Sequence, residues 1–191
     1  MRALAEKVSK LLGDEISTVF LSDSKLPEGA QVLPLFLGAG KHVSEDIPKL
    51  AATSNCTLLP SLGEQSEAIA ALAYDAVTQE TKRINVLFGL YRFGGFDSLT
   101  AALHDSNKRC SLVAMASMHS EPSISSVLNL WHEDGIEKVT LQPMLLFGGR
   151  SLARVRSMIA ESDIPNVSLA PVLSELDGFA EFVADCFRGN V

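Results

Sequence analysis

Two stretches of the chain carry the same order of aliphatic residues, proline and glycine. "VLPLFLGAGKHV" (32–43) aligns with "LQPMLLFGGRSL" (141–152), and the alignment places Pro34 opposite Pro143. In both stretches, aliphatic residues surround the proline and a pair of closely spaced glycines follows. An aliphatic run that ends in glycines is typical of a buried strand that leaves the core through a tight turn. The sequence therefore predicts the same strand and turn twice.

A second pair of stretches supports the repeat. Residues 58–77 align with residues 169–187, and here Pro60 lies opposite Pro171. Because two landmarks recur in the same order with similar flanking patterns, we interpret the chain as two related halves. We place the junction between the halves near "TQETKR" (78–83).

The second half shows a regular alternation of strand-like and helix-like segments. Short aliphatic runs alternate with longer stretches of helical period, and this alternation is typical of β-α-β units with a parallel sheet. The predicted strands are 84–90, 110–117, 138–147 and 166–173, and the predicted helices are 96–106, 122–135, 150–162 and 176–189. The predicted fold class is α/β, with two pseudo-repeated parallel-sheet lobes.

The first half is a shortened copy of this pattern. It begins with a predicted helix at 2–13, and its first predicted strand, "STVFLS" (17–22), corresponds to the second strand of the other half. An opening strand is absent from the pattern. Residues 23–30 are too few for a helical crossover between parallel strands, which takes about a dozen residues. We assign residues 1–83 to a shortened N-terminal half and residues 84–191 to a complete C-terminal half.

The composition limits the classes of function. Hydrophobic residues make up 47% of the chain and charged residues 20%, which favours a folded globular protein. The formal net charge of −7, without a basic cluster, argues against nucleic-acid binding. The three cysteines form no CxxC pair, so we expect reduced thiols and no zinc or iron–sulfur site. With no signal-like segment and no apolar run long enough to cross a bilayer, we expect a cytoplasmic protein without membrane contact.

The histidine after the first glycine turn is the leading candidate for chemistry. His42 follows the predicted strand, at the carboxyl edge where open parallel sheets bind ligands. An imidazole there can act as a metal ligand or as a general base. Gly38 and Gly40 would let the backbone turn and keep side chains away from a ligand. Glu45 and Asp46 have a simpler explanation, because acidic residues in the first turn of a helix complement the helix dipole.

"VLPLFLGAGKHVSEDIP" (32–48) resembles the strand-turn-helix signature of the sirohydrochlorin chelatases of the CbiX and SirB type. The stretch from His119 to Phe147 is similar to another segment of that family, and "LLFGGRSLARVRSMI" (145–159) resembles the second-half version of the motif, in which the histidine is replaced. The resemblance implies the chelatase fold.

The resemblance also implies an activity. Members of this family insert a divalent metal, cobalt or ferrous iron, into the tetrapyrrole sirohydrochlorin, in cobalamin or siroheme synthesis. The metal is a substrate, and no organic cofactor is implied. His42 matches the family's metal-binding histidine. Glu45 is our candidate for accepting protons or handling the metal, because it lies near His42 in the sequence.

The chain departs from the family pattern at the second metal ligand. The family opens with a strand that ends in a "GHGSR"-like turn, and this sequence starts after that point. The equivalent turn of the second half has Leu90 where the histidine is needed. His119 or Tyr91 could replace the missing ligand, since both follow predicted strands at the same edge. Tyr91 is also a candidate for substrate binding.

Four arginines are candidates for contacts with the carboxylates of the macrocycle. Arg92 and Arg150 follow strand ends and are the preferred substrate-binding residues, whereas Arg154 and Arg156 are explained as surface charge on a helix. His104 and His132 lie near helix ends, where a cation is ordinary.

Three functional hypotheses remain open. The first is an active chelatase that uses His42 and a substitute second ligand. The second is a chelatase-like protein that binds tetrapyrrole or metal without inserting the metal. The third is a non-enzymatic partner subunit, or a homodimer, that pairs through a sheet edge left open by the absent strand.

Overall fold

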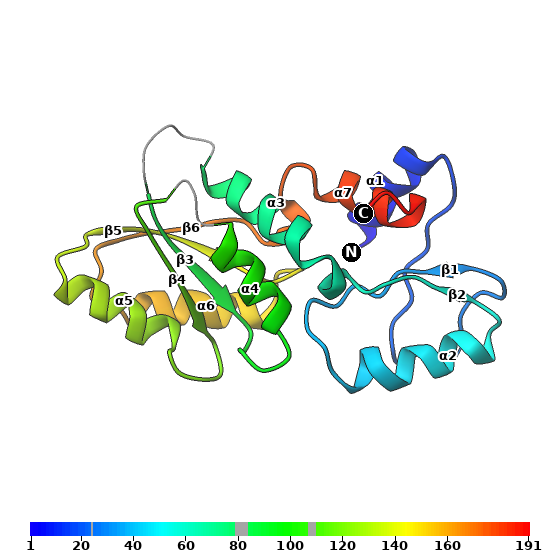
Figure 1. Cartoon of the computed structure of the whole chain (residues 1–191), viewed down its shortest axis with the longest axis horizontal. Coiled ribbons are helices and arrows are strands. Elements are labelled where there is room, and N and C mark those ends of the chain that lie inside the picture. The colour runs from blue at the N-terminus through cyan, green and yellow to red at the C-terminus, as the bar shows by residue number, and fades with distance from the viewer. Residues whose placement is uncertain (24, 79–83, 107–109) are drawn as a thin grey trace.

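The structure is a computed structural model that describes residues 1–23, 25–78, 84–106 and 110–191. Two lobes lie side by side, each with a parallel sheet covered by helices on both faces (Figure 1). The strands are β1 (Gln31–Val32), β2 (Thr57–Leu58), β3 (Asn85–Leu90), β4 (Leu112–Ser117), β5 (Lys138–Pro143) and β6 (Asn166–Leu169). The α-helices are α1 (Arg2–Leu12), α2 (Ile47–Thr53), α3 (Ser66–Thr78), α4 (Asp97–Asp105), α5 (Ile124–Glu133), α6 (Arg150–Ala160) and α7 (Phe179–Arg188).

The second lobe has a four-stranded sheet in the order β4-β3-β5-β6, with every pair parallel. Its central strand β3 is apolar on both faces, as expected of a strand that lies between two layers of helices. Figure 1 shows α3 and α4 on one face and α5 and α6 on the other. The α/β class, the parallel sheet and the order of elements in this half are confirmed. Shorter strands are the main difference, because β6 ends before Pro171.

The first lobe has a two-stranded parallel sheet, β1 and β2, with α1 and α7 on one face and α2 on the other (Figure 1). The prediction of a strand at residues 17–22 was wrong, since this segment has no regular secondary structure. A strand needs a neighbour for its backbone hydrogen bonds, and residues 17–22 pair with none of the described strands. The bridge after it, as far as it is described, contains no helix, in agreement with its length.

The two halves exchange their last helices. The final helix of the first half, α3, packs against α4 of the second, and the final helix of the second half, α7, packs against α1 of the first. One apolar cluster accordingly joins Val8 of α1, Tyr74 of α3, Phe88 of β3 and Phe182 of α7. The boundary between residues 83 and 84 stays a prediction about the sequence repeats, whereas the packed lobes share helices from both halves.

Ser123 and Ser61 illustrate how local sequence begins two of the helical segments. The Ser123 hydroxyl caps α5 by accepting a hydrogen bond from Ser126 N–H. Ser61 and Glu64 form a reciprocal capping box at the short 3₁₀ turn Leu62–Gln65 before α3. None of the described helices is long and apolar enough to span a bilayer.

Candidate functional site

The turn that carries His42 lies at the junction of the two lobes. Gly38 is packed so closely against Phe96, on the loop between β3 and α4, that a side-chain β-carbon at this position would lie 2.5 Å from the ring. The next residue, Ala39, donates its backbone N–H to the Gly95 carbonyl at 2.8 Å. The contact between lobes therefore fixes the start of the turn, and His42 follows it directly.

His42 begins a single π-helical turn, His42–Asp46, that leads into α2. Its Nδ1 lies 2.8 Å from Asp46 Oδ2, and its side chain is 62% exposed. An ionised carboxylate can only accept a hydrogen bond, so Nδ1 carries the proton and Nε2 of the neutral ring keeps its lone pair. A carboxylate on the distal nitrogen is the usual support of a metal-binding histidine. The arrangement presents Nε2 to solvent as a free ligand.

Asp46 is the contact of His42 that sequence reasoning missed. Its position in the first turn of a helix had a sufficient explanation in the helix dipole. The available signal was its spacing, because a residue four positions after His42 lies on the same face of a helix. Glu45, the residue chosen instead, points its carboxylate toward Lys49 Nζ at 3.5 Å. Its role in proton transfer stays a prediction.

The structure brings His119 and Tyr91 together. Tyr91 follows β3, His119 follows β4, and their ring centroids are 4.5 Å apart with the planes tilted by 55°. Both side chains belong to exposed residues. The two candidates for a second ligand therefore form one aromatic pair, on the loops beyond the carboxyl ends of β3 and of the edge strand β4.

The loop that carries His119 is held by several hydrogen bonds. The buried Ser117 hydroxyl accepts from the backbone N–H groups of His119 and Ser120 at 3.0 and 3.1 Å. From α6, Arg154 Nε donates to the Met118 carbonyl at 3.1 Å. Arg154 was interpreted as surface charge on a helix, and it is an exposed residue of α6. Its hydrogen bond adds a contact between α6 and the residue before His119.

Glu121 adds a negative charge to the same loop. Its carboxylate accepts from Ser123 N–H at 2.8 Å and from the Ser126 hydroxyl at 2.9 Å. The backbone hydrogen bond from Ser123, followed by that from the Ser126 side chain, holds the pKa of Glu121 below its usual range. The lowered pKa keeps this carboxylate ionised two residues after His119 in the sequence. Its hydrogen bonds with Ser123 and Ser126 are those of a group that caps α5.

The remaining predicted residues lie at the edge without contacts that define a role. Arg92 lies on the loop after β3 and Arg150 is the first residue of α6, and both are exposed. Neither Gly38 nor Gly40 has a positive φ. Gly38 is explained by the packing of Phe96, whereas a β-carbon at Gly40 would meet nothing within 4 Å. The assignment of these four residues to substrate binding stays a prediction.

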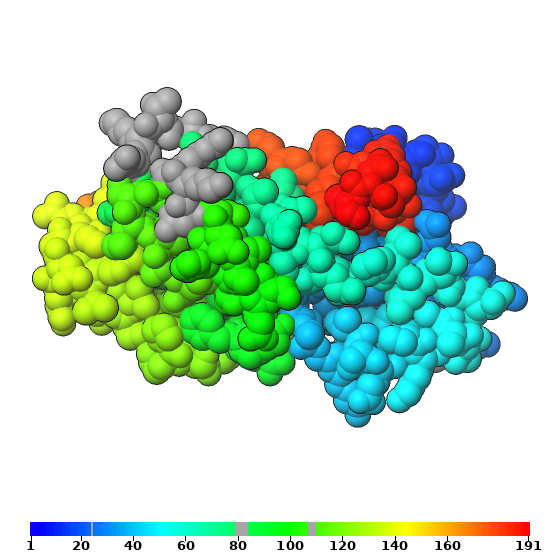
Figure 2. Space-filling view, in the orientation of Figure 1, coloured from blue at the N-terminus to red at the C-terminus, as the bar shows by residue number. Residues whose placement is uncertain are grey.

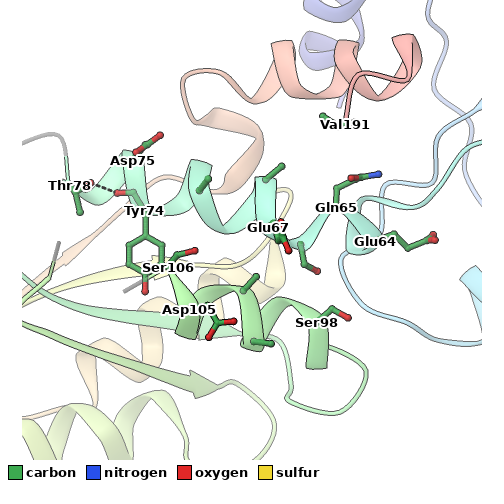
Figure 3. Close-up of a pocket in the computed structure, with 15 residues that line it drawn as sticks. Glu64, Gln65, Glu67, Tyr74, Asp75, Thr78, Ser98, Asp105, Ser106 and Val191 are labelled. Carbon is green, nitrogen blue, oxygen red and sulfur yellow. Dashed lines mark hydrogen bonds between the residues drawn. The ribbon is translucent and has the colours of Figure 1, made fainter. Parts of the chain in front are cut away.

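A cavity of about 900 Å³ between α3 and α4 is a separate feature (Figure 3). Acidic side chains that line it include Glu64, Glu67 and Asp105. None of the candidate residues His42, Tyr91 and His119 lines it, and its charge does not suit a substrate with carboxylates. In the space-filling view, the surface is hollowed between the loops of the second lobe and the α2 side of the first (Figure 2).

Within the described ranges, no cluster of three or more His, Cys, Asp or Glu side chains could hold a metal ion. His104 and His132 lie in the last turns of α4 and α5. His104 faces Asp105, with Nδ1 3.4 Å from Oδ1. The cysteines are free, as expected.

The fold agrees with solved structures of chelatases. CbiX, described as the terminal enzyme for biosynthesis of siroheme in denitrifying bacteria, superposes with a TM-score of 0.74 at 14% identity, over 99% of this chain and 90% of that one. SirB from Bacillus subtilis with Fe³⁺ gives a TM-score of 0.73 at 16% identity, over 99% of this chain and 87% of SirB. The sirohydrochlorin chelatase SirB from Bacillus subtilis subspecies spizizenii, in complex with cobalt, gives 0.54 at 21% identity, over 86% and 68% of the two chains.

No family model matches the sequence, and no curated protein matches it. At these identities the superpositions establish the fold alone. The resemblance found in the sequence is confirmed at that level: the chain has the fold of the CbiX and SirB chelatases.

Proposed function

We propose that this protein inserts a divalent metal ion, cobalt(II) or ferrous iron, into the tetrapyrrole sirohydrochlorin. The observation that carries the proposal is the exposed His42 ring, whose Nδ1 is bound to Asp46 while Nε2 remains free. It lies at the lobe junction of a fold shared with chelatases that were solved with Fe³⁺ and with cobalt.

The chemistry requires a ligand and a proton acceptor. His42 Nε2 holds the metal ion, and the Asp46 carboxylate keeps the ring in the tautomer that makes this possible. As the macrocycle takes up the metal dication, its pyrrole nitrogens release two protons. Exposed carboxylates next to the metal, Glu45 first among them, pass these protons to solvent.

The opposite side of the junction supplies the remaining groups. Tyr91 and His119 lie on the second lobe's loops, and the His119 ring offers a second nitrogen ligand. Arg92 and Arg150 are exposed at the carboxyl edge of the sheet, where their guanidinium groups can pair with carboxylates on the rim of the macrocycle.

The test is a metal-insertion assay. Purified protein is mixed with sirohydrochlorin and cobalt(II), and insertion is followed by the change in absorbance of the macrocycle. We expect His42→Ala to reduce the catalysed rate by about 100-fold or more, because it removes the ligand. His132→Ala, an exposed histidine in the last turn of α5, is the matched control and should keep the wild-type rate. Equal rates for the wild type and His42→Ala would overturn the proposal.

A second candidate function is the binding of tetrapyrrole or metal without insertion. It is favoured by the lack, in the part of the chain that the structure describes, of a ready cluster of three metal ligands. Under this hypothesis the fluorescence of sirohydrochlorin is quenched on binding, while metal insertion does not exceed the uncatalysed background. Insertion above background would exclude it.

A further inference from the structure

A second cavity, of about 370 Å³, lies inside the first lobe, away from the proposed metal site. Leu4 and Val8 of α1 and Val183 of α7 line one side, and Ile47 and Leu50 of α2 line another. The remaining walls are residues 16–21 and residues 30–36, which include β1. The cavity is therefore an apolar slot between the two helical layers of the lobe, flanked on its edges by two extended segments.

The sequence repeat shows which part of the second lobe corresponds to this slot. In the second lobe, β3 lies between β4 and β5. The counterpart of β4 in the first half is the segment 17–22, and the counterpart of β5 is β1. The slot between them therefore occupies the place of β3.

Backbone hydrogen bonds support this correspondence. Leu59 N–H donates to the Val32 carbonyl at 2.9 Å, and the aligned pair in the second lobe, Ala170 and Leu141, makes the same bond at 2.9 Å. The pair β1–β2 of the first half and the pair β5–β6 of the second half thus have the same register, as their sequence patterns suggest.

The segment that follows β1 carries backbone donors without hydrogen-bond partners among the described residues, and it lines the slot. In the second lobe, Met144 N–H donates to the Gly89 carbonyl of β3 at 2.8 Å. Leu35 is the aligned counterpart of Met144, and its N–H has no hydrogen-bond partner among the described residues; the same is true of Leu33. Because alternate residues of a parallel strand bond to opposite neighbours, these donors belong to the edge that does not pair with β2.

The side chains around the slot are apolar and partly uncovered. Val19, Phe20 and Leu21 are 37, 56 and 42% exposed, which is high for three consecutive large hydrophobic residues. Apolar walls above and below the slot suit a strand with apolar side chains on both faces, as in β3, where every residue from Val86 to Leu90 is buried.

We propose that this slot is an acceptor for an extended apolar segment, which enters as a strand parallel to β1 and pairs with the edge from Gln31 to Leu35. This mode of recognition takes affinity from main-chain hydrogen bonds and specificity from alternate side-chain pockets. The occupant is a strand from outside residues 1–191 with the apolar chemistry of β3. A second copy of residues 1–191 is a poor occupant, because the aliphatic strands that the structure describes in its second lobe are already paired. The inference goes beyond the proposed chelatase function and needs no metal.

The probe is a synthetic peptide with the β3 sequence Asn85–Leu90, extended by lysines at both ends for solubility and labelled with a fluorophore. Binding to the intact protein is followed by fluorescence anisotropy. We expect saturable binding, and we expect the same peptide with Leu87→Pro to bind at least about tenfold more weakly, since proline removes a backbone donor and does not fit a central strand.

A matched pair of variants locates the binding site. Ala5→Phe places a ring in the slot and should weaken peptide binding by about tenfold or more. Ala3→Phe, on the exposed face of the same helix, should leave binding unchanged. Amide hydrogen exchange gives an independent measurement, in which the bound peptide slows exchange at Leu33 and Leu35.

Three results would overturn the proposal. Equal binding of the β3 and Leu87→Pro peptides would indicate an apolar cavity without strand pairing. Unchanged exchange at Leu33 and Leu35 under saturating peptide would place the peptide elsewhere. A concentration-dependent dimer in sedimentation, abolished by Ala5→Phe and with no peptide binding, would show that a second copy fills the slot.

Discussion

The turns after β1 and after β5 have the same order of residue types and different chemistry. Each follows a proline and two closely spaced glycines, and each leads into a helix. In the first turn His42 is exposed and bound to Asp46. In the second, Ser151 and Val155 occupy the aligned positions, and Val155 is fully buried. The repeat supplies the scaffold twice, and only one copy carries a histidine–aspartate pair. The pair is therefore an addition to the fold and is not needed to form it.

Val155 and Asp46 occupy aligned positions, and the largest expected effect comes from replacing each residue by the other. Val155→Asp buries a carboxylate without a partner and should cost about 3–5 kcal/mol of the free energy of unfolding. Asp46→Val should cost less than about 1 kcal/mol, because the Asp46 side chain is 40% exposed. Urea unfolding at neutral pH measures both. Similar losses for the two variants would show that the first turn also depends on its pair for stability.

The glycines of the two turns should also respond differently. Gly149 has φ 117° and ψ −149°, a region that only glycine occupies easily, so Gly149→Ala should cost about 1–3 kcal/mol. Its counterpart Gly40 has no positive φ, and a β-carbon added there would have no neighbour within 4 Å, so Gly40→Ala should be neutral or slightly stabilising. Thermal unfolding of the two variants checks this, and a larger loss for Gly40→Ala would contradict it.

A third prediction concerns the effect of Asp46 on metal binding by His42. Asp46→Asn weakens the hydrogen bond that the residue accepts from His42 Nδ1–H. We expect the affinity for cobalt(II) to fall by about tenfold, and we expect the free energy of unfolding to stay unchanged. Calorimetric titration measures the affinity. Asp105→Asn, which alters another exposed contact between a histidine and an aspartate, is the matched control and should leave affinity unchanged. A tenfold loss in both variants would point to a general effect of charge.

The last expected effect concerns a buried thiol of α7 in the first lobe. Burial, with a further contribution from the Asp185 charge, raises the pKa of Cys186 in α7 to about 11. The unfolded thiol ionises near pH 9, so the unfolded state loses its proton first and stability falls as the pH rises from about 9 toward 11. Cys186→Ala should reduce this slope in urea unfolding measured across that range. An unchanged slope would assign the alkaline loss to other groups, such as Tyr74, whose pKa burial raises to about 12.

The sequence determined the α/β class, the repeat, the elements of the second half and the position of His42 at a strand edge. These follow from local patterns: hydrophobic period, turn glycines and helix caps act within a few residues. It also indicated that the first half lacks a strand. The failure of residues 17–22 to form a strand was not predictable from their composition, because a strand depends on a neighbour elsewhere in the chain.

Only the tertiary structure decided which residues meet. The exchange of α3 and α7 between lobes, the contact of Gly38 with Phe96 and the pairing of Tyr91 with His119 join segments far apart in the sequence. The choice of Asp46 over Glu45 as the partner of His42 depended on the phase of one helical turn. Local interactions select the elements, whereas packing and backbone pairing between distant segments select the contacts, and the candidate site consists of such contacts.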